Sequence, residues 1–368
     1  MKRRDFIKKA GATAAVSGLA ATSIANAENF DYPKVKWRIA AGFPKNLNLL
    51  FAASTMLSEK VAKLTNGQFE IQVFAPGELV PANQIFDAVS QGTVEVGHSA
   101  SYYYHGKNTA LSIDTVLPFG MSARMQNAWF YAGGGLEVLR EVFAKYNIIN
   151  FPGGNTTAQM GGWFRKEVKS LEDLKGLKFR IPGFGGEILS RLGVIPQTIP
   201  ASDVYSSLEK GTIDAAEFVG PYDDEKLGLQ AVAPYYYTPG FWEGAATISF
   251  FVNDQKWAEL PKLYQEIFEM VCADINQWMI AQYDALNPIA LATLTKNGAK
   301  LRSFSKDILE ASYEVAQEIY EEEREKNPDF KLVYDHWKAF LNQEYQWFRI
   351  NENIFQNFMG SQIRKQNR

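Results

Sequence analysis

The sequence has few residues that bind transition metals. Its 368 residues contain one cysteine, Cys272, and three histidines, at positions 98, 105 and 336. One cysteine cannot form an internal disulfide, and so few ligands cannot build an iron–sulfur cluster, a c-type haem attachment or an HExxH zinc site. The sequence therefore lacks the ligands for the common metal cofactors of exported redox enzymes.

Basic runs and long apolar runs are also missing after residue 27. Residues 1–27 carry a net charge of +4, so the chain without them would carry −7 instead of −3. An acidic chain repels phosphate backbones, so no nucleic-acid partner is expected. No later stretch approaches the 18 apolar residues of a spanning helix, so the processed chain is not expected to span a membrane.

The amino terminus has the pattern of an export signal. Paired arginines in RRDFIKKA precede a weakly apolar stretch that ends at Ala25-Asn26-Ala27, an A-x-A cleavage pattern. This combination predicts a twin-arginine signal peptide over residues 1–27 and a periplasmic location, rather than a cytosolic helix that begins with basic residues. The remaining 341 residues are long enough for two domains.

Periodicity and an internal repeat predict an α/β fold. A strand is expected over 34–40, a helix over 47–64 and a second strand over 68–74. Residues 81–96 (PANQIFDAVSQGTVEV) resemble residues 200–215 (PASDVYSSLEKGTIDA), and each copy predicts a cap, an amphipathic helix, a glycine stop and a strand. Two related α/β halves would leave a ligand cleft between them, beyond the carboxyl ends of strands.

Three charged residues are candidates for a site in that cleft. Arg180 lies near the end of a predicted strand over 177–181. A glycine-rich turn and a helix expected from residue 187 follow, and this arrangement favours a carboxylate pocket. Glu217 and Glu243 each lie in an apolar stretch, AAEFV and FWEGA. The residues alone leave three interpretations for them: a glycosidase-like acid/base pair, a cation site, or salt bridges to nearby bases.

At these residues the chain resembles the solute-binding proteins of tripartite ATP-independent periplasmic (TRAP) transporters, in particular the subgroup that binds α-keto acids and small monocarboxylates with a metal ion. The similarity runs over essentially the whole chain after the signal. It is carried by LPFGMSARMQNAWFYAGGG (117–135), GNTTAQMGGWFRKEV (154–168), LKGLKFRIPGFGGEIL (174–189), LEKGTIDAAEFVGPYDDEKLGL (208–229) and FWEGAATISFFVN (241–253).

The resemblance implies a role for each candidate residue. Arg180 would bind the ligand carboxylate. A cation, with sodium favoured over calcium, would be held near the ligand by the side chains of Gln159, Glu217 and Glu243 and the backbone carbonyl of Phe218. Phe218 stands where this subgroup usually has tryptophan. Three aromatic residues would form cleft walls: Tyr102, Tyr103 and Trp163.

The fold expected from this resemblance is that of periplasmic binding proteins. Domain I would comprise residues 28–150 and about 241–300, domain II residues 151–240 and parts of 301–330, and a C-terminal helix over 331–368 could exchange between two subunits of a homodimer. The expected function is binding of a 2-oxo or 2-hydroxy monocarboxylate for delivery to a TRAP permease, without catalysis. The alternatives are an exported hydrolase that uses Glu217 and Glu243, and a partner-recruiting protein built around the aromatic tail.

Overall fold

The computed structural model describes residues 32–366. The predicted signal peptide lies outside these residues. None of the helices in the described part of the chain combines the length and the apolarity that a membrane crossing requires.

The first of the two sheets in the described chain has five strands in the order β2-β1-β3-β10-β4. β1 and β3 pair in parallel, and β10 runs antiparallel to both β3 and β4. Alternation in VKWRIAA buries Trp37 and Ile39 of β1, as a strand with one face in a core should. The strands are β1 (Val35–Ala41), β2 (Phe69–Phe74), β3 (Val96–Ser99), β4 (Ile148–Asn155) and β10 (Thr247–Asn253).

The second sheet within residues 32–366 has six strands in the order β11-β9-β5-β8-β6-β7. β6 pairs in parallel with both β7 and β8, while β5 runs antiparallel to β8 and β9. The strands are β5 (Trp163–Phe164), β6 (Lys178–Arg180), β7 (Ile195–Gln197), β8 (Ala215–Ala216), β9 (Tyr235–Thr238) and β11 (Lys300–Ser303). The expected α/β fold with two sheets is confirmed, whereas the domain boundaries stay a prediction.

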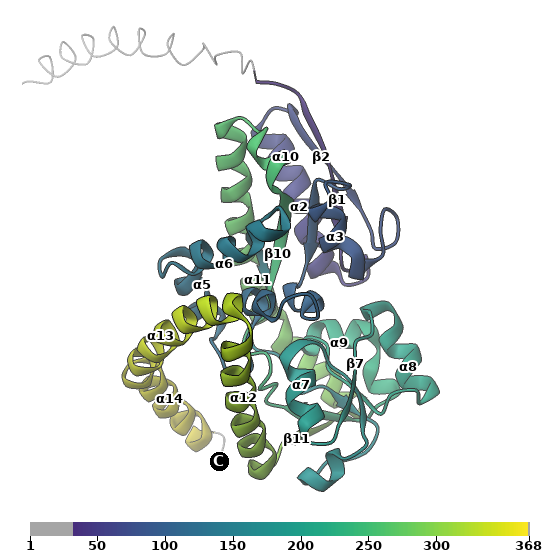
Figure 1. The fold of residues 1–368 in the computed structure, drawn as a ribbon. Coiled ribbons are helices and arrows are strands. Elements are labelled where there is room, and N and C mark those ends of the chain that lie inside the picture. Colours follow the sequence, from purple (N-terminus) through teal and green to yellow (C-terminus); the bar gives the residue numbers. More distant parts are fainter. Residues whose placement is uncertain (1–31, 367–368) are drawn as a thin grey trace, which may run out of the picture. The chain divides into compact units, whose positions relative to one another are not determined.

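Helices supply the remaining regular structure (Figure 1). The 35-residue α11 (Lys262–Lys296) packs on both β4 of the first sheet and α9. The other α-helices are α2 (Asn48–Leu64), α3 (Ile85–Ser90), α4 (Ser112–Thr115), α5 (Ala123–Tyr131), α6 (Gly135–Phe143), α7 (Gly183–Arg191), α8 (Val204–Lys210), α9 (Pro221–Leu227), α10 (Asp254–Ala258), α12 (Lys306–Lys326), α13 (Pro328–Ile350) and α14 (Glu352–Gln366). Short 3-10 helices include η1 (Ala82–Gln84), η2 (Ser101–Tyr104), η3 (Thr109–Leu111), η4 (Ala144–Tyr146), η5 (Leu171–Leu174), η6 (Ala201–Asp203) and η7 (Leu229–Ala231).

The two copies of the sequence repeat have the same local structure. Each starts with an extended proline, Pro81 or Pro200, followed by a 3-10 turn (η1 or η6) and an α-helix (α3 or α8). Each then turns at a glycine with a positive φ, +70° at Gly92 and +71° at Gly211, which glycine adopts without steric cost. The strands that follow, β3 and β8, pair in parallel with β1 and β6 respectively. The predicted helix, glycine stop and strand are confirmed in both copies, whereas neither helix start has a side-chain cap hydrogen bond.

Two element boundaries differ from the prediction. The helix expected from residue 187 begins at Gly183, because the glycine-rich stretch forms the first turn of α7 and Pro182 precedes it as the N-cap. The single terminal helix expected over 331–368 is two helices, α13 and α14, which separate at Asn351 with φ −103° and ψ −88°. The glycines before residue 187 predicted a turn where α7 begins. Side-chain periodicity gave no sign of the break between α13 and α14.

A buried carboxylate links the first sheet to the segment that carries Tyr102. Asp114 in α4 is fully buried and accepts hydrogen bonds from the hydroxyl groups of Ser101 and Ser249 and from the amide of Asn150. The adjacent Thr115 hydroxyl oxygen accepts from the backbone N–H groups of Ser101 (2.7 Å) and Tyr102 (3.3 Å). These bonds attach η2, with its tyrosines, to β4 and β10.

We expect Asp114→Ala to lower the free energy of unfolding by about 3 kcal/mol, because three buried donors would lose their acceptor. Urea unfolding followed by circular dichroism measures this change. Asp284→Ala, which removes an exposed carboxylate from α11, is the control and should change stability by less than about 0.5 kcal/mol. Equal stability of the two variants would contradict the proposed importance of this network.

Candidate functional site

Arg180 stands at the carboxyl end of β6 and is 1% exposed. Its Nε donates to the carbonyl oxygen of Ile199 at 3.0 Å, and its Nη2 lies 3.5 Å from the hydroxyl oxygen of Tyr103. Its Nη1 donates to the carbonyl oxygen of Glu217 at 3.0 Å and also to the carboxylate Oε1 of that residue. The guanidinium is therefore held in one orientation from three sides.

Glu217 comes directly after β8, the parallel neighbour of β6. Its backbone N–H donates to the carbonyl oxygen of Arg180 at 3.2 Å. The pairing of β6 with β8 therefore brings the two residues together where both strands end. Both side chains of this ion pair are buried. Burial raises the pKa of Glu217 to about 7, although the charge of Arg180 acts in the opposite direction.

A loop and a turn add Gln159 and Glu243 to this cluster. The backbone N–H of Gln159 donates to the carbonyl oxygen of Glu243 at 3.0 Å, and that of Met160 donates to the carbonyl oxygen of Val219 at 3.1 Å. Both Gln159 and Glu243 are buried. Burial raises the pKa of the Glu243 carboxyl, and the nearby negative charge of Glu217 raises it further.

Three buried oxygens at this point find no hydrogen-bond donor within residues 32–366: Gln159 Oε1, Glu217 Oε2 and Glu243 Oε2. Buried acceptors without a donor are costly, and a hard cation is a partner that satisfies several of them at once. Each of the three side chains that the sequence predicted as cation ligands thus leaves one buried oxygen unpaired. These three oxygens are of the kind that ligates a hard cation.

The same region contains too few acidic or imidazole groups for a transition-metal site. Among the described residues, no group of three or more histidine, cysteine, aspartate or glutamate side chains is arranged to hold a metal. A cation here would depend on two carboxylates, one amide and a backbone carbonyl, such as that of Phe218. The ring of Phe218 lies under the guanidinium carbon of Arg180, 5.5 Å from it, and so belongs to the same cluster.

Of the three predicted wall residues, the structure brings Tyr103 closest to Arg180. Tyr102 and Tyr103 meet edge to face with centroids 4.8 Å apart, and negative charge on Glu243 adds to the burial that raises the pKa of Tyr102. Trp163 stacks on Tyr236 at 3.9 Å, and its Nε1 donates to Asp224 at 2.9 Å. Its contacts therefore tie it to Tyr236 and Asp224, while its role as a cleft wall stays a prediction.

Sequence reasoning missed a second pair of buried carboxylates, Asp223 and Asp224 in α9. Asp224 accepts from Trp163 and from the hydroxyl of Tyr236 (2.7 Å), and Asp223 accepts from the hydroxyl of Tyr283 in α11 (2.5 Å). Burial raises the pKa of Asp223 to about 7 and that of Asp224 to about 6. In PYDDEK, two acids in the first turn of a helix resemble an exposed start, so no sequence signal marked them as buried.

The two sheets, the buried arginine and the unpaired oxygens define an extracytoplasmic solute-binding protein of the TRAP type. The chain belongs to the bacterial extracellular solute-binding proteins of family 7, whose model matches residues 41–327. The class predicted from the sequence is therefore confirmed. The described fold is that of TRAP periplasmic binding proteins.

Several relatives are similar over nearly their whole length. A monocarboxylate 2-oxoacid-binding periplasmic protein of Nostoc sp. is 48% identical, over 98% of this chain and 100% of the relative. A TRAP solute-binding protein of Bordetella bronchiseptica, crystallised as a mixed-occupancy dimer with copurified calcium and picolinate in the bound site, is 52% identical with a TM-score of 0.89, covering 90% and 99% of the two chains. One of Pseudoalteromonas atlantica, with bound sodium and pyruvate, is 37% identical with a TM-score of 0.85, covering 88% and 99%.

The raised pKa of Asp223 predicts how the stability of the ligand-free protein depends on pH. The folded protein keeps a proton on this carboxyl up to about pH 7, whereas the unfolded chain releases it near pH 4. Between these values the folded state binds more protons, so the free energy of unfolding should fall as pH rises.

Urea unfolding between pH 4.5 and 7.5, in the presence of chelator, measures this slope. Asp223→Asn should make the slope shallower, because the amide does not titrate, and Asp284→Asn at an exposed position of α11 should leave it unchanged. An Asp223→Asn slope as steep as that of the unmodified protein would contradict the assignment.

Proposed function

We propose that this protein is a periplasmic receptor that binds a small 2-oxo or 2-hydroxy monocarboxylate together with a metal cation and delivers it to a TRAP permease. The observation that carries the proposal is the cluster around Arg180. One buried guanidinium adjoins three buried oxygens that lack donors. A guanidinium recognises a carboxylate, and oxygens of this kind bind a hard cation.

The charges of the cluster explain why ligand and cation would bind together. Arg180 carries one positive charge, and Glu217 and Glu243 can carry two negative charges. An anion alone would enter a site whose acids repel it. A cation between Glu217 and Glu243 would remove that repulsion and would offer the ligand oxygens a second positive centre beside Arg180.

The ligands of the relatives share one chemical feature. Pyruvate, bound in the P. atlantica protein, and picolinate, bound in the B. bronchiseptica protein, each carry a carboxylate next to a second donor atom, a keto oxygen or a ring nitrogen. Two donors on adjacent carbons can chelate one cation. This feature supports a 2-oxo or 2-hydroxy acid as the ligand class for this chain.

For the cation, sodium is our first candidate and calcium is the alternative. Calcium affinity rises with the number of charged ligands and with rigidity. This cluster offers two carboxylates, and Arg180 already engages one of them. Relatives hold either ion. Gln159, Glu217, Phe218 and Glu243 would hold the cation, and the bound ion would supply positive charge to the ligand oxygens.

No bond-making chemistry is assigned to the site. The family is one of transporter binding proteins. The comparisons give no support to a hydrolase that uses Glu217 and Glu243 as acid and base. Export by the twin-arginine route, through Arg3 and Arg4, belongs to the same proposal and rests on the sequence pattern alone.

Isothermal titration calorimetry with pyruvate, 2-oxobutyrate and lactate tests the proposal. Binding should be saturable, should disappear with Arg180→Ala, and should weaken at least tenfold when both sodium and calcium are removed. Glu217→Gln should weaken binding and reduce its dependence on the cation, because it removes one negative ligand.

Arg191→Ala, which removes an exposed arginine paired with Glu322, is the matched control and should bind like the unmodified protein. Circular dichroism confirms that each variant is folded. If no carboxylate in the panel binds the folded, cation-loaded protein, the proposed function is wrong.

We also propose a homodimer formed by exchange of C-terminal helices. α14 buries none of its residues and exposes several large apolar side chains, among them Ile354 (61%) and Phe355 (61%). A groove of about 330 Å³ runs between α12 and α13 and is lined by Phe119, Tyr313 and Leu341 among others. The apolar face of α14 from a second copy is a suitable occupant for it.

Light scattering after size-exclusion chromatography tests the dimer. The unmodified protein should have twice the mass of one chain, and Phe355→Ser combined with Phe358→Ser should give monomers, because an apolar helix face would lose its contacts. Met270→Ser, at an equally exposed apolar position of α11, should remain dimeric. Monomeric behaviour of the unmodified protein at all concentrations would exclude helix exchange.

A further inference from the structure

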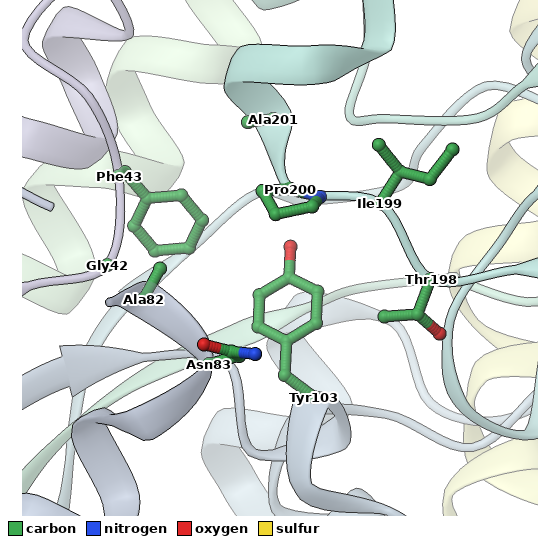
Figure 2. A pocket seen from close by; sticks show the side chains of 9 residues that line it. All are labelled: Gly42, Phe43, Ala82, Asn83, Tyr103, Thr198, Ile199, Pro200 and Ala201. Atoms are coloured by element: carbon green, nitrogen blue, oxygen red, sulfur yellow. The ribbon is translucent and has the colours of Figure 1, made fainter. Parts of the chain in front are cut away.

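The residues around the Arg180–Glu217 ion pair differ in charge. The pocket that Tyr103 and Ile199 line beside Arg180 has no acid or base among its lining residues, all of which lie within the described chain (Figure 2). A third buried carboxylate, that of Asp224 in α9, acts on Glu217. Burial is the main cause of the raised pKa of Glu217, and negative charge on Asp224 adds to it. Asp224 therefore belongs to the electrostatic surroundings of the proposed cation site.

Two donors from neighbouring strands hold the Asp224 carboxylate. Its Oδ2 accepts from Nε1 of Trp163 in β5 at 2.9 Å and from the hydroxyl of Tyr236 in β9 at 2.7 Å. Trp163 and Tyr236 are paired across the two strands, and their rings stack with centroids 3.9 Å apart. All three side chains are buried. The carboxylate is thus fixed through Oδ2, while Oδ1 can accept from another donor.

That second oxygen binds the segment that follows Glu217. Asp224 Oδ1 accepts from the backbone N–H of Val219 at 3.4 Å. The carbonyl oxygen of Val219 accepts from the backbone N–H of Met160 at 3.1 Å, and Met160 directly follows Gln159. Both backbone groups of Val219 are therefore bonded, one to a side chain of α9 and the other to the loop that carries Gln159.

The hydrogen bond to Asp224 fixes the direction of the Phe218 carbonyl group. The Phe218 C=O and the Val219 N–H belong to one trans peptide unit, in which the two groups point in opposite directions. An N–H directed at Asp224 therefore turns the Phe218 carbonyl away from Asp224. No backbone N–H within residues 32–366 donates to this carbonyl oxygen. Its orientation is thus set by Asp224.

We propose that Asp224 is a positioning residue of the cation site. Through the Val219 N–H it holds the Phe218 carbonyl in the orientation in which that oxygen can bind the cation. Asp224 acts without touching the ion, because its own oxygens already accept three hydrogen bonds. This inference rests on the proposed function, since it assumes that a cation binds beside Phe218.

Asp224→Asn tests this role, because the amide has the shape of the carboxylate but only one acceptor oxygen. At least one of the three hydrogen bonds is then lost. Calcium titration of chelator-treated protein in excess pyruvate, with sodium in a parallel series, measures the cation Kd. This Kd should rise about 10- to 100-fold, as for other residues that orient metal ligands. At cation concentrations that saturate the variant, the pyruvate Kd should return close to that of the unmodified protein.

Asp223→Asn is the matched control. Asp223 is the neighbouring buried acid of the same helix, and its carboxylate accepts from Tyr283. This variant loses a carboxylate at almost the same place but keeps the bond between Asp224 and Val219. Its cation Kd should change much less than that of Asp224→Asn. An equal rise in both variants would show an effect of net charge alone, and the inference would be wrong.

Hydrogen exchange gives a readout that needs neither ion nor ligand. In the cation-free protein, the Val219 amide should exchange faster in Asp224→Asn than in the unmodified chain, because it has lost its acceptor. Asp223→Asn should leave this rate unchanged. NMR of labelled protein measures both rates, and an unaltered Val219 amide in Asp224→Asn would overturn the inference.

A second variant covers the case in which Asp224→Asn does not fold, as judged by circular dichroism. Tyr236→Phe removes one donor to Asp224 Oδ2 and keeps the ring that stacks on Trp163. It should raise the cation Kd and speed the exchange of the Val219 amide, both to a smaller extent. Normal values of both quantities in folded Tyr236→Phe would also overturn the inference.

The two levels of failure can be told apart. If the unmodified protein binds neither cation nor pyruvate, the proposed function itself fails. If it binds both, and folded Asp224→Asn binds the cation as tightly, the proposed function stands and only the positioning role is wrong. The role is also wrong if Asp224→Asn weakens pyruvate binding equally at every cation concentration, because Asp224 would then act on the ligand and not through the ion.

Discussion

The site depends on one interaction, the buried ion pair between Arg180 and Glu217. Removing two charges from water costs several kcal/mol per ion, and the pair persists only where hydrogen bonds satisfy the remaining groups. Here the parallel pairing of β6 and β8 puts both residues at the carboxyl ends of these two neighbouring strands of the second sheet. The carbonyl oxygens of Ile199 and Glu217 occupy further donors of the guanidinium. Loss of either partner would leave the other buried without its counter-charge, so this ion pair constrains the residues at the ends of β6 and β8.

The pair also leaves the site electrostatically incomplete. Arg180 engages one oxygen of Glu217 and none of the oxygens of Glu243, so Glu217 Oε2, Glu243 Oε2 and Gln159 Oε1 keep unused acceptor capacity. The pKa values of both glutamates are raised by burial, which means that their ionised forms are costly without a further positive charge. A cation would stabilise the ionised forms of both glutamates, and an anionic ligand would then offset the positive charge of the cation and Arg180. In this account cation and ligand are parts of one binding event.

The sequence predicted those parts of the fold that depend on local patterns. Alternating apolar residues marked β1 and β2, and the repeat marked two equivalent helix–glycine–strand units, because side-chain periodicity and glycine conformations act over a few residues. It predicted the family through five sequence stretches, three of which contain Arg180, Glu217 and Glu243. It could not predict Asp223 and Asp224, whose burial follows from packing against Trp163, Tyr236 and Tyr283, residues distant in the chain. It also placed the start of α7 too late, because tertiary context allowed glycines into a helix.

The central claim is that one cation and Arg180 bind the same carboxylate ligand. A crystal structure of the processed chain grown with pyruvate and calcium, with anomalous data collected at long wavelength, tests it most directly. The account predicts one anomalous peak about 2.3–2.6 Å from Gln159 Oε1, Glu217 Oε2, the Phe218 carbonyl oxygen and Glu243 Oε2. The pyruvate carboxylate should lie between that ion and the guanidinium of Arg180. Pyruvate bound at Arg180 without an ion, or an ion elsewhere in the chain, would contradict the account.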